Sequence, residues 1–303
     1  MRMKITDILI DPDTGEKLDY NQETNEFNSG DIGRFTVRIE NNIPVILPKK
    51  ISDELKHSEF HQRSNTEFEY LEHYQKDSEV HDYAKEADSM VVRDENRRIH
   101  QLIISKIPWD AKLVLDVGCG GGWLSKQIVN DSTQVISMDV SSENPLHALR
   151  SHPHENHFGL VADVFNLPIK EESIDCIVAS EIMEHVPSPK LFIDVLLKAL
   201  VKGGKLLITT PYNEKLKYHL CVHCNNQTPS NAHLHSFNET NIVKHFPESV
   251  LKWDYQLFMN NYFIKSRMSL LTRFLPFKLW RVLDKISNKV LRKPTRFFLI
   301  IEK

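Results

Sequence analysis

Short apolar runs alternate with segments of helical spacing from about residue 108 to the end of the chain. Runs of this kind predict buried strands, and apolar positions that recur every three or four residues predict helices. Residues 188–201 have the helical pattern, with Ser188 or Pro189 suited to the start and Gly203-Gly204 to the end. The alternation predicts the α/β class, with a parallel sheet covered by helices on both faces. The expected strands are residues 113–117, 134–138, 158–163, 174–181 and 205–211.

The same pattern divides the chain into three regions. Residues 1–50 contain short alternating runs and turn residues, which predict a small β-rich module. Residues 51–107 are acidic and helical in pattern, and they predict a linker or cap. Residues 108–303 form the α/β domain, with further strands expected at 251–260 and 297–302 on either side of a basic helical insertion at about 262–295.

The most informative motif follows the first strand of the α/β domain. The strand carries Asp116, and the chain then continues through Gly118, Gly120, Gly121 and Gly122 into a helical pattern. Glycines in such a turn let the backbone approach a ligand that a Cβ atom would exclude. An acid at the end of the next strand, here Asp139, can accept hydrogen bonds from a ribose. The motif therefore predicts a ligand that contains a nucleoside, either a nicotinamide dinucleotide or S-adenosylmethionine.

The rest of the motif set resembles the class I S-adenosylmethionine-dependent methyltransferases over roughly residues 68–303. The matching segments are residues 113–122, Asp139, Ala162-Asp163, the stretch Ser180 to Val186, the predicted helix at 188–201, Gly203-Gly204 and the fifth predicted strand at 205–211. The resemblance implies a Rossmann-like, mostly parallel seven-stranded sheet. It also implies a cofactor site for S-adenosylmethionine formed by Asp116, Gly118, Gly120, Gly122, Asp139, Ala162, Asp163 and Glu181.

Within that implied site, the glycines approach the methionine part of the cofactor and Asp139 holds the ribose hydroxyls. Asp163 reaches the adenine amine, and Glu181 lines the side where the methyl group is transferred. Two acids suit a cationic ligand with a diol better than they suit a pyrophosphate, which favours S-adenosylmethionine over a dinucleotide.

Composition limits the classes of protein that remain. At 303 residues and 41% hydrophobic content, the chain can fill a sizeable core and allows two units. Its four cysteines show no disulfide spacing, and neither a secretory signal nor a long apolar span is visible, so we expect a cytoplasmic protein. The formal net charge of −3 does not favour bulk binding of nucleic acid.

Positive charge is concentrated in residues 262–296, which contain ten basic residues and one acid, Asp284. A helix from about Leu279 to Leu291 would also place Leu279, Val282, Leu283, Ile286 and Val290 on one face. One interpretation is a helical insertion packed on the sheet with a solvated basic rim. The others are a peripheral contact with an acidic membrane, and a lid for an anionic substrate.

A second group of candidate residues follows the fifth strand. Cys221 and Cys224, followed by His233 and His235, can supply four ligands to a structural zinc ion, with His223 as an alternative ligand. A reduced cysteine pair with surface histidines is the competing interpretation. Proton transfer from an acceptor hydroxyl requires a base, and His235 or His185 is the candidate, with Tyr212 and His233 nearby.

The N-terminal region resembles the small zinc-ribbon-like module that activates some methyltransferases. Asp11-Pro12-Asp13 stands where that module has a cysteine knuckle, and residues 42–45 replace its closing segment. We therefore expect this copy to hold no zinc and to serve as a scaffold or as a contact in a homodimer. In related enzymes the following helical segment caps the cofactor. Its candidates for contact are Tyr70, His73, Tyr74 and Tyr83, unless the segment is only a packed linker.

Together these features predict a methyltransferase that acts on the hydroxyl of a small molecule or of a lipid- or sugar-linked metabolite. RNA methylation is an alternative, but the fourth strand is followed by Ser180-Glu181-Ile182-Met183 and not by an Asn/Asp-Pro-Pro-aromatic motif. A cofactor-binding scaffold without catalytic activity is the other alternative.

Overall fold

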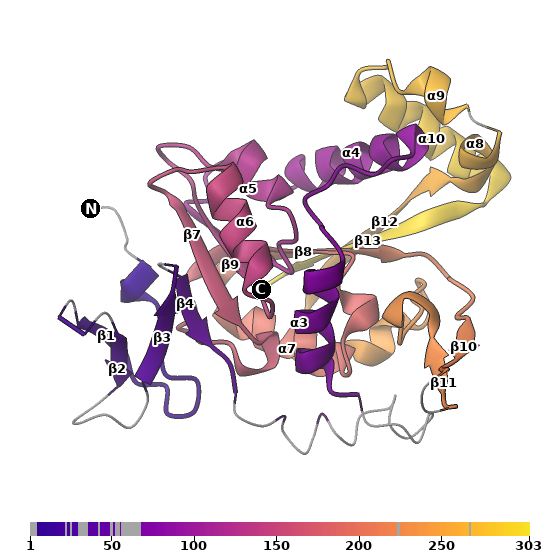
Figure 1. Cartoon of the computed structure of the whole chain (residues 1–303). Helices are drawn as coiled ribbons and strands as arrows, with labels where there is room; N and C mark the ends of the chain where they lie inside the picture. Colours follow the sequence, from indigo (N-terminus) through magenta and orange to yellow (C-terminus); the bar gives the residue numbers. More distant parts are fainter. Residues whose placement is uncertain are drawn as a thin grey trace.

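The computed structural model describes residues 5–21, 23–24, 26–29, 36–41, 43–48, 51, 55, 68–222, 225–266 and 268–303 (Figure 1). Its centre is a sheet in which seven strands follow the order β7-β6-β5-β8-β9-β13-β12. β7, β6, β5, β8 and β9 are parallel, whereas β13 is antiparallel to both of its neighbours. The predicted fold class is therefore confirmed. The strands are β5 (Leu113–Val117), β6 (Gln134–Asp139), β7 (His157–Ala162), β8 (Ile174–Ser180), β9 (Leu200–Pro211), β12 (Lys252–Asn260) and β13 (Pro294–Glu302).

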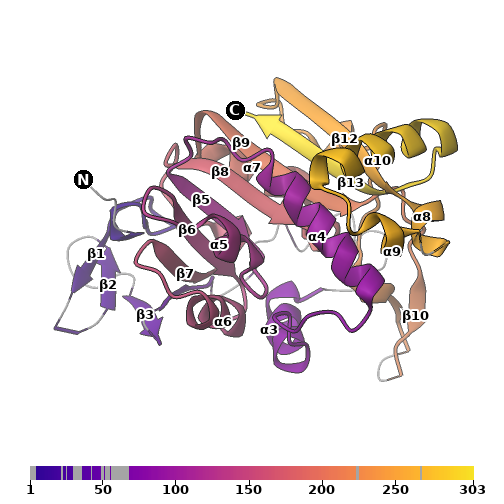
Figure 2. The same ribbon diagram turned by 90° about the horizontal axis from the view of Figure 1, so that it is seen from above.

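Two hydrophobic cores lie on the two faces of this sheet, because successive side chains of a strand point to opposite faces. Leu113 and Leu115 belong to one core, and Val114 between them belongs to the other. The first core is covered by α7 (Pro189–Ala199), whose first turn is capped by the Ser188 hydroxyl. The second core is covered by α4 (Met90–Ile104), α5 (Trp123–Ile128) and α10 (Phe277–Leu291), as Figure 2 shows from above. α6 (Glu143–Ser151) packs beside β7.

The strands near the N-terminus continue the central sheet. β4 (Ile43–Ile46) pairs in parallel with β7 through Val45–Val161 and Ile46–Ala162. In the described part of the chain the sheet thereby reaches eleven strands. The remaining elements here are η1 (Ile5–Asp7), β1 (Leu18–Asn21), β2 (Glu26–Ser29) and β3 (Thr36–Glu40).

The chain between β12 and β13 forms the expected helical insertion, with α8 (Asn261–Lys265), α9 (Ser269–Thr272) and α10. The predicted apolar face of α10 exists, but it is exposed and lies beside the buried face of the helix. Trp280, Asp284 and Ser287 are buried beneath the helix, whereas Val282 and Ile286 are 52% and 55% exposed. No helix in the described ranges is both long enough and apolar enough to cross a membrane.

The other elements are short segments around the carboxyl ends of the parallel strands, together with the linker helix α3. They are α3 (Tyr70–Val80), η2 (Val164–Asn166), η3 (Met183–His185), the hairpin β10 (Tyr218–Leu220) and β11 (Gln227–Pro229), η4 (Ser230–Ala232) and η5 (Ile242–His245).

Candidate active site

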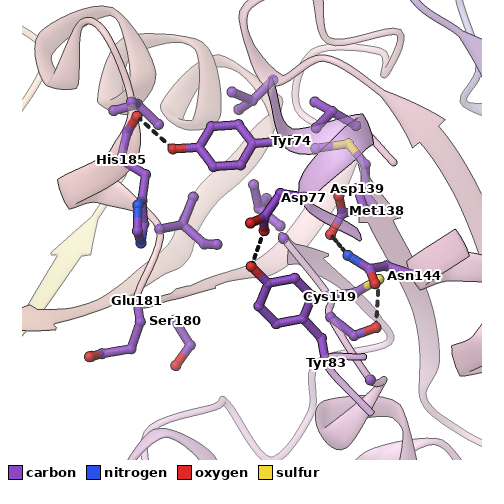
Figure 3. A pocket seen from close by; sticks show the side chains of 18 of the residues that line it. Tyr74, Asp77, Tyr83, Cys119, Met138, Asp139, Asn144, Ser180, Glu181 and His185 are labelled. Carbon is purple, nitrogen blue, oxygen red and sulfur yellow. Dashed lines mark hydrogen bonds between the residues drawn. The ribbon is translucent and has the colours of Figure 1, made fainter. Parts of the chain in front are cut away.

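A cavity of about 370 Å³ lies where β5, β6, β7 and β8 end (Figure 3). This position follows from the fold, because the carboxyl ends of neighbouring parallel strands leave a crevice at the point where the strand order reverses. Of the predicted cofactor residues, six line it: Gly118, Gly120, Asp139, Ala162, Asp163 and Glu181. We call it the cofactor cavity.

The glycine loop forms one wall of the cofactor cavity. Gly118 has a φ of +69° and Gly122 a φ of +74°. Residues with a side chain rarely adopt this backbone conformation. A Cβ atom on Gly122 would lie 2.6 Å from the Cβ of Ala148, so the loop can pack against α6 only without a side chain there. Gly122 is the N-cap of α5 and does not itself line the cavity.

Asp139 occupies the end of β6 on the cavity wall. Its carboxylate accepts hydrogen bonds from the backbone N–H of Ser141 and from the side-chain amide of Asn144, each at 3.0 Å. Burial raises the pKa of Asp139, and these hydrogen bonds act in the opposite direction. The side chain is held as an acceptor facing the cavity, which is the arrangement that a ribose diol requires.

Asp163 follows β7 and is tied to the linker helix. It accepts a hydrogen bond from the Tyr70 hydroxyl at 2.5 Å and one from the backbone N–H of Phe165 at 3.1 Å. Burial and the neighbouring Asp163 raise the pKa of Tyr70, so the phenol stays protonated and donates. Tyr74 and Tyr83 also line the cavity, whereas His73 does not.

Asp116 lies within β5 and does not line the cavity, in contrast to the other predicted acids. It is 1% exposed, and one of its carboxyl oxygens has no hydrogen-bond partner. Burial, together with the charge of Asp139, raises the pKa of Asp116 to about 8. The group is therefore a neutral carboxylic acid at neutral pH.

A second cavity, of about 740 Å³, adjoins the first. Glu181 and His185 line both cavities and so connect them. Glu181 has a φ of +57°, and strained backbone of this kind concentrates at functional sites. Its carboxylate forms an ion pair with the Arg296 guanidinium at 3.1 Å. Arg292 and Lys293 add positive charge to the wall formed by the chain that enters β13.

Acidic and histidine side chains meet at one side of the second cavity. Ligand atoms of Glu184, His185 and His233 lie within 4.8 Å of one another. A buried oxygen of Glu184 and the buried Nδ1 of His185 have no hydrogen-bond partner. Burial and the neighbouring His233 lower the pKa of His185 to about 4, so its imidazole is neutral. His233 Nδ1 lies 2.5 Å from an oxygen of Glu214.

The predicted catalytic and zinc residues are only partly brought together. His235 is buried, with Nε2 3.0 Å from the carbonyl oxygen of Val186, and it lines neither cavity. Cys221 follows β10 and is not in the group with His233, which the structure places beside Glu184 and His185 instead. Cys224 and His223 lie outside the described residues.

Sequence reasoning missed Glu184 and Glu214 as site residues, and it anticipated Arg292, Lys293 and Arg296 only as members of the basic segment 262–296 that could form a lid for an anionic substrate. Glu184 was detectable, because a pair of glutamates three residues apart, followed directly by histidine, comes immediately after the fourth strand. Glu214 and Arg296 carry no local signal, because only the folded sheet brings their segments together.

The strand order, the glycine loop and the acids at the ends of β6 and β7 define a class I S-adenosylmethionine-dependent methyltransferase domain. Residues 115–208 match the family model described as a methyltransferase domain. This region of the chain is a methyltransferase domain, and the predicted resemblance is confirmed for it. The likeness of residues 1–50 to an activator module stays a prediction.

Curated relatives match the same part of the chain. The ubiquinone biosynthesis O-methyltransferase of Actinobacillus pleuropneumoniae serotype 5b is 37% identical over 121 residues, which cover 37% of this chain and 50% of that protein. The mitochondrial protein of that name from Mus musculus is 32% identical over 125 residues, 38% of this chain and 33% of its own length. The chain thus spans a third to a half of these two relatives.

Among solved structures, an S-adenosylmethionine-dependent methyltransferase from Mesorhizobium loti is 13% identical and has a TM-score of 0.48. The match covers 69% of this chain and all of the other.

Proposed function

We propose that this protein transfers the methyl group of S-adenosylmethionine to the hydroxyl oxygen of a small molecule. The observation that carries the proposal is the connection between two cavities. The cofactor cavity has the glycine loop and Asp139, and it shares Glu181 and His185 with a second, polar cavity that has room for an acceptor. The names of the curated relatives support oxygen as the acceptor atom.

The reaction requires the acceptor oxygen and the sulfonium methyl carbon to be aligned. The new bond joins the acceptor oxygen to the methyl carbon, the carbon–sulfur bond breaks, and S-adenosylhomocysteine leaves with the electron pair. Glu181 stands where the two cavities meet, held by Arg296, and therefore orients the acceptor against the methyl group. The hydroxyl proton passes to water in the second cavity.

Calorimetric titration with S-adenosylmethionine, S-adenosylhomocysteine and NAD tests the cofactor. We expect binding of the first two and none of NAD. Asp139→Asn should weaken S-adenosylhomocysteine binding by roughly 10- to 100-fold, because a charged acceptor of two ribose hydrogen bonds is lost. Asp110→Asn, which changes an exposed acid elsewhere, is the matched control.

Other results of this titration would point to other functions. Binding of NAD alone would contradict the proposal. If the folded protein binds no S-adenosyl compound, the cofactor assignment is wrong and a scaffold role takes its place. Cofactor binding with methylation of RNA, but of no small hydroxyl compound, would contradict the proposed acceptor.

We further propose a divalent cation, zinc being the candidate, at Glu184, His185 and His233. Burying a carboxyl oxygen or an imidazole nitrogen without a hydrogen-bond partner is costly, and a cation beside Glu184 and His185 would remove that cost. Glu214 accepts the Nδ1 proton of His233, which leaves Nε2 of that ring free to bind a metal. When bound, the cation would act as a Lewis acid that lowers the pKa of an acceptor hydroxyl.

Metal content measured on protein purified without a metal-affinity tag tests this site. We expect close to one equivalent of zinc in the wild type, and a loss of roughly 10-fold or more in affinity for His233→Ala. Cys221→Ser should retain the metal, because Cys221 is not part of this group. Loss of zinc in Cys221→Ser with retention in His233→Ala would instead support the cysteine-containing ligand set.

A further inference from the structure

The outer face of α10 is apolar and uncovered. Leu279, Val282, Leu283, Ile286 and Val290 are 39% to 71% exposed, and at 100° per residue they form a face next to the one that carries the buried Trp280. An amphipathic helix on a globular domain normally turns such a face inward. Here a neighbouring face of the helix, with Trp280, Asp284 and Ser287, is buried instead.

The segments before α10 also expose large apolar side chains. Leu271 and Phe274 are 74% and 77% exposed, and Tyr262 on α8 and Met268 before α9 are about half exposed. The three helices lie together at one end of the molecule, far from the N-terminal strands (Figure 1). A gathering of exposed apolar side chains at one end of a molecule marks a site of interaction.

The inner side of α10 is fixed by specific polar contacts, so its outward face is built into the fold. Asp284 accepts hydrogen bonds from the backbone N–H of Met259 at 2.8 Å and from Arg281 at 2.9 Å. Arg98 of α4, 1% exposed, donates to the carbonyl oxygens of Thr272 and Leu275.

Basic side chains flank the apolar face. At 100° per residue, the exposed Lys278, Lys285 and Lys289 follow a line next to the apolar positions, and Arg292 and Lys293 continue past the end of the helix. The only acid in residues 262–296 is Asp284, which is buried and paired with Arg281. The surface that α8, α9 and α10 expose is therefore apolar and positively charged.

We propose that this surface, formed by α8, α9, α10 and residues 292–293, docks on a lipid bilayer with anionic headgroups. Apolar side chains at the headgroup boundary and lysines beside acidic lipids are the two contributions that hold an interfacial helix. A second copy of this chain fits less well, because two such faces would bring like charges together.

The docking surface continues into the second cavity. Asn261 of α8 and Arg292 and Lys293 after α10 are among the residues that line it. A docked protein therefore carries part of this cavity's rim against the bilayer. The docking itself does not depend on the proposed methyl transfer.

Co-sedimentation of the full chain with phosphatidylcholine vesicles, with and without phosphatidylglycerol, tests the proposal. We expect binding to the anionic vesicles at low salt, and a loss of roughly 10-fold or more at high salt or with phosphatidylcholine alone. The double variants Ile286→Ser/Val290→Ser and Lys285→Glu/Lys289→Glu should each weaken vesicle binding by roughly 10-fold or more.

Two substitutions elsewhere serve as matched controls. Leu251→Ser changes an apolar side chain that is 90% exposed, and Lys190→Glu changes an exposed lysine of α7. Both should bind vesicles as the wild type does, and circular dichroism checks that every variant folds. If the folded wild type does not bind anionic vesicles at low salt, or if the controls lose binding equally, the proposal fails. A dimer in sedimentation velocity that Ile286→Ser/Val290→Ser dissociates would also overturn it, because the face would then be a contact between copies.

Discussion

Asp116 shows how one buried side chain couples the stability of the fold to pH. Its pKa rises from 3.8 to about 8 in the folded protein, chiefly through burial. The native state therefore binds a proton that the unfolded state has already lost between these values. Its contribution to stability is present below about pH 4 and is lost as the pH rises to about 8.

Asp116→Asn removes this pH dependence, because an amide resembles the protonated acid in shape and charge. We expect the difference between the free energies of unfolding, variant minus wild type, to increase steadily from about pH 5 to about pH 8. Urea unfolding of ligand-free protein at several pH values measures the difference. Parallel curves for the two proteins would show that Asp116 does not titrate in this range.

The glycines of the chain allow backbone strain to be separated from steric contact. Gly203→Ala places a Cβ atom at a φ of +78° with nothing within 4 Å, so it should cost about 1 to 2 kcal/mol. Gly122→Ala combines the same strain with a 2.6 Å approach to Ala148, which adds about 1 to 3 kcal/mol. Thermal unfolding of both variants provides the comparison, and equal costs would contradict tight packing of the loop on α6.

Residues that end strands were predictable, and residues that reach the site through loops were not. Asp139 and Glu181 follow apolar runs, and parallel strands bring their carboxyl ends to one edge. Arg296 meets Glu181 only because β13 inserts beside β9, and the sequence pattern does not specify that neighbour. His235 has the chemistry of a base, but its ring is buried, contacts the carbonyl oxygen of Val186 and lines neither cavity.

At the level of elements, α4 holds the insertion in place through Arg98. The guanidinium lies 4.9 Å from the ring centre of Trp280 and donates to backbone carbonyls in the loop before α10. Arg98→Met leaves those carbonyls without a donor, and we expect a loss of about 3 kcal/mol in the free energy of unfolding.

Arg93→Met is the matched control for this substitution. Arg93 is on the same helix, but its side chain is 44% exposed and its ion pair with Glu86 lies at the surface. Its replacement should cost less than about 0.5 kcal/mol. Urea unfolding measures both variants, and similar costs would show that Arg98 does not anchor the insertion.

The insertion also shows the limit of periodicity as a predictor. The spacing of Leu279, Val282, Ile286 and Val290 correctly indicates a helix with an apolar face. It does not say which way that face points, because direction depends on the tertiary contacts of Asp284 and Trp280.

At the scale of the whole molecule, the N-terminal strands share the core of the methyltransferase domain. Leu9 is fully buried and belongs to the same cluster as Leu115 and Ile136. We therefore expect Leu9→Ala to destabilise both regions together, by about 2 to 5 kcal/mol. All four tryptophans, at positions 109, 123, 253 and 280, lie outside the N-terminal strands, so tryptophan fluorescence reports unfolding of the distant region.

Tyr20→Ala, which changes a side chain 41% exposed on β1, is the control and should leave the tryptophan-detected transition nearly unchanged. A normal transition in Leu9→Ala would mean that the N-terminal strands unfold independently. The alternation of strands and helices predicted the central sheet, whereas the parallel pairing of β4 with β7 joins segments over a hundred residues apart and has no local signal.

The tyrosines of the linker have a consequence for how the protein responds to its ligand. Tyr70 and Tyr74 of α3, with Tyr83 after it, form part of the cofactor cavity although they precede the domain that holds the glycine loop. A ligand that contacts only the folded arrangement stabilises it by RT ln(1 + [L]/Kd). The backbone amides of α3 should therefore exchange with deuterium ever more slowly as S-adenosylhomocysteine is added. Protection of the α3 amides from exchange would therefore measure occupancy of the cofactor cavity, although α3 is not part of the sheet whose strand ends form that cavity.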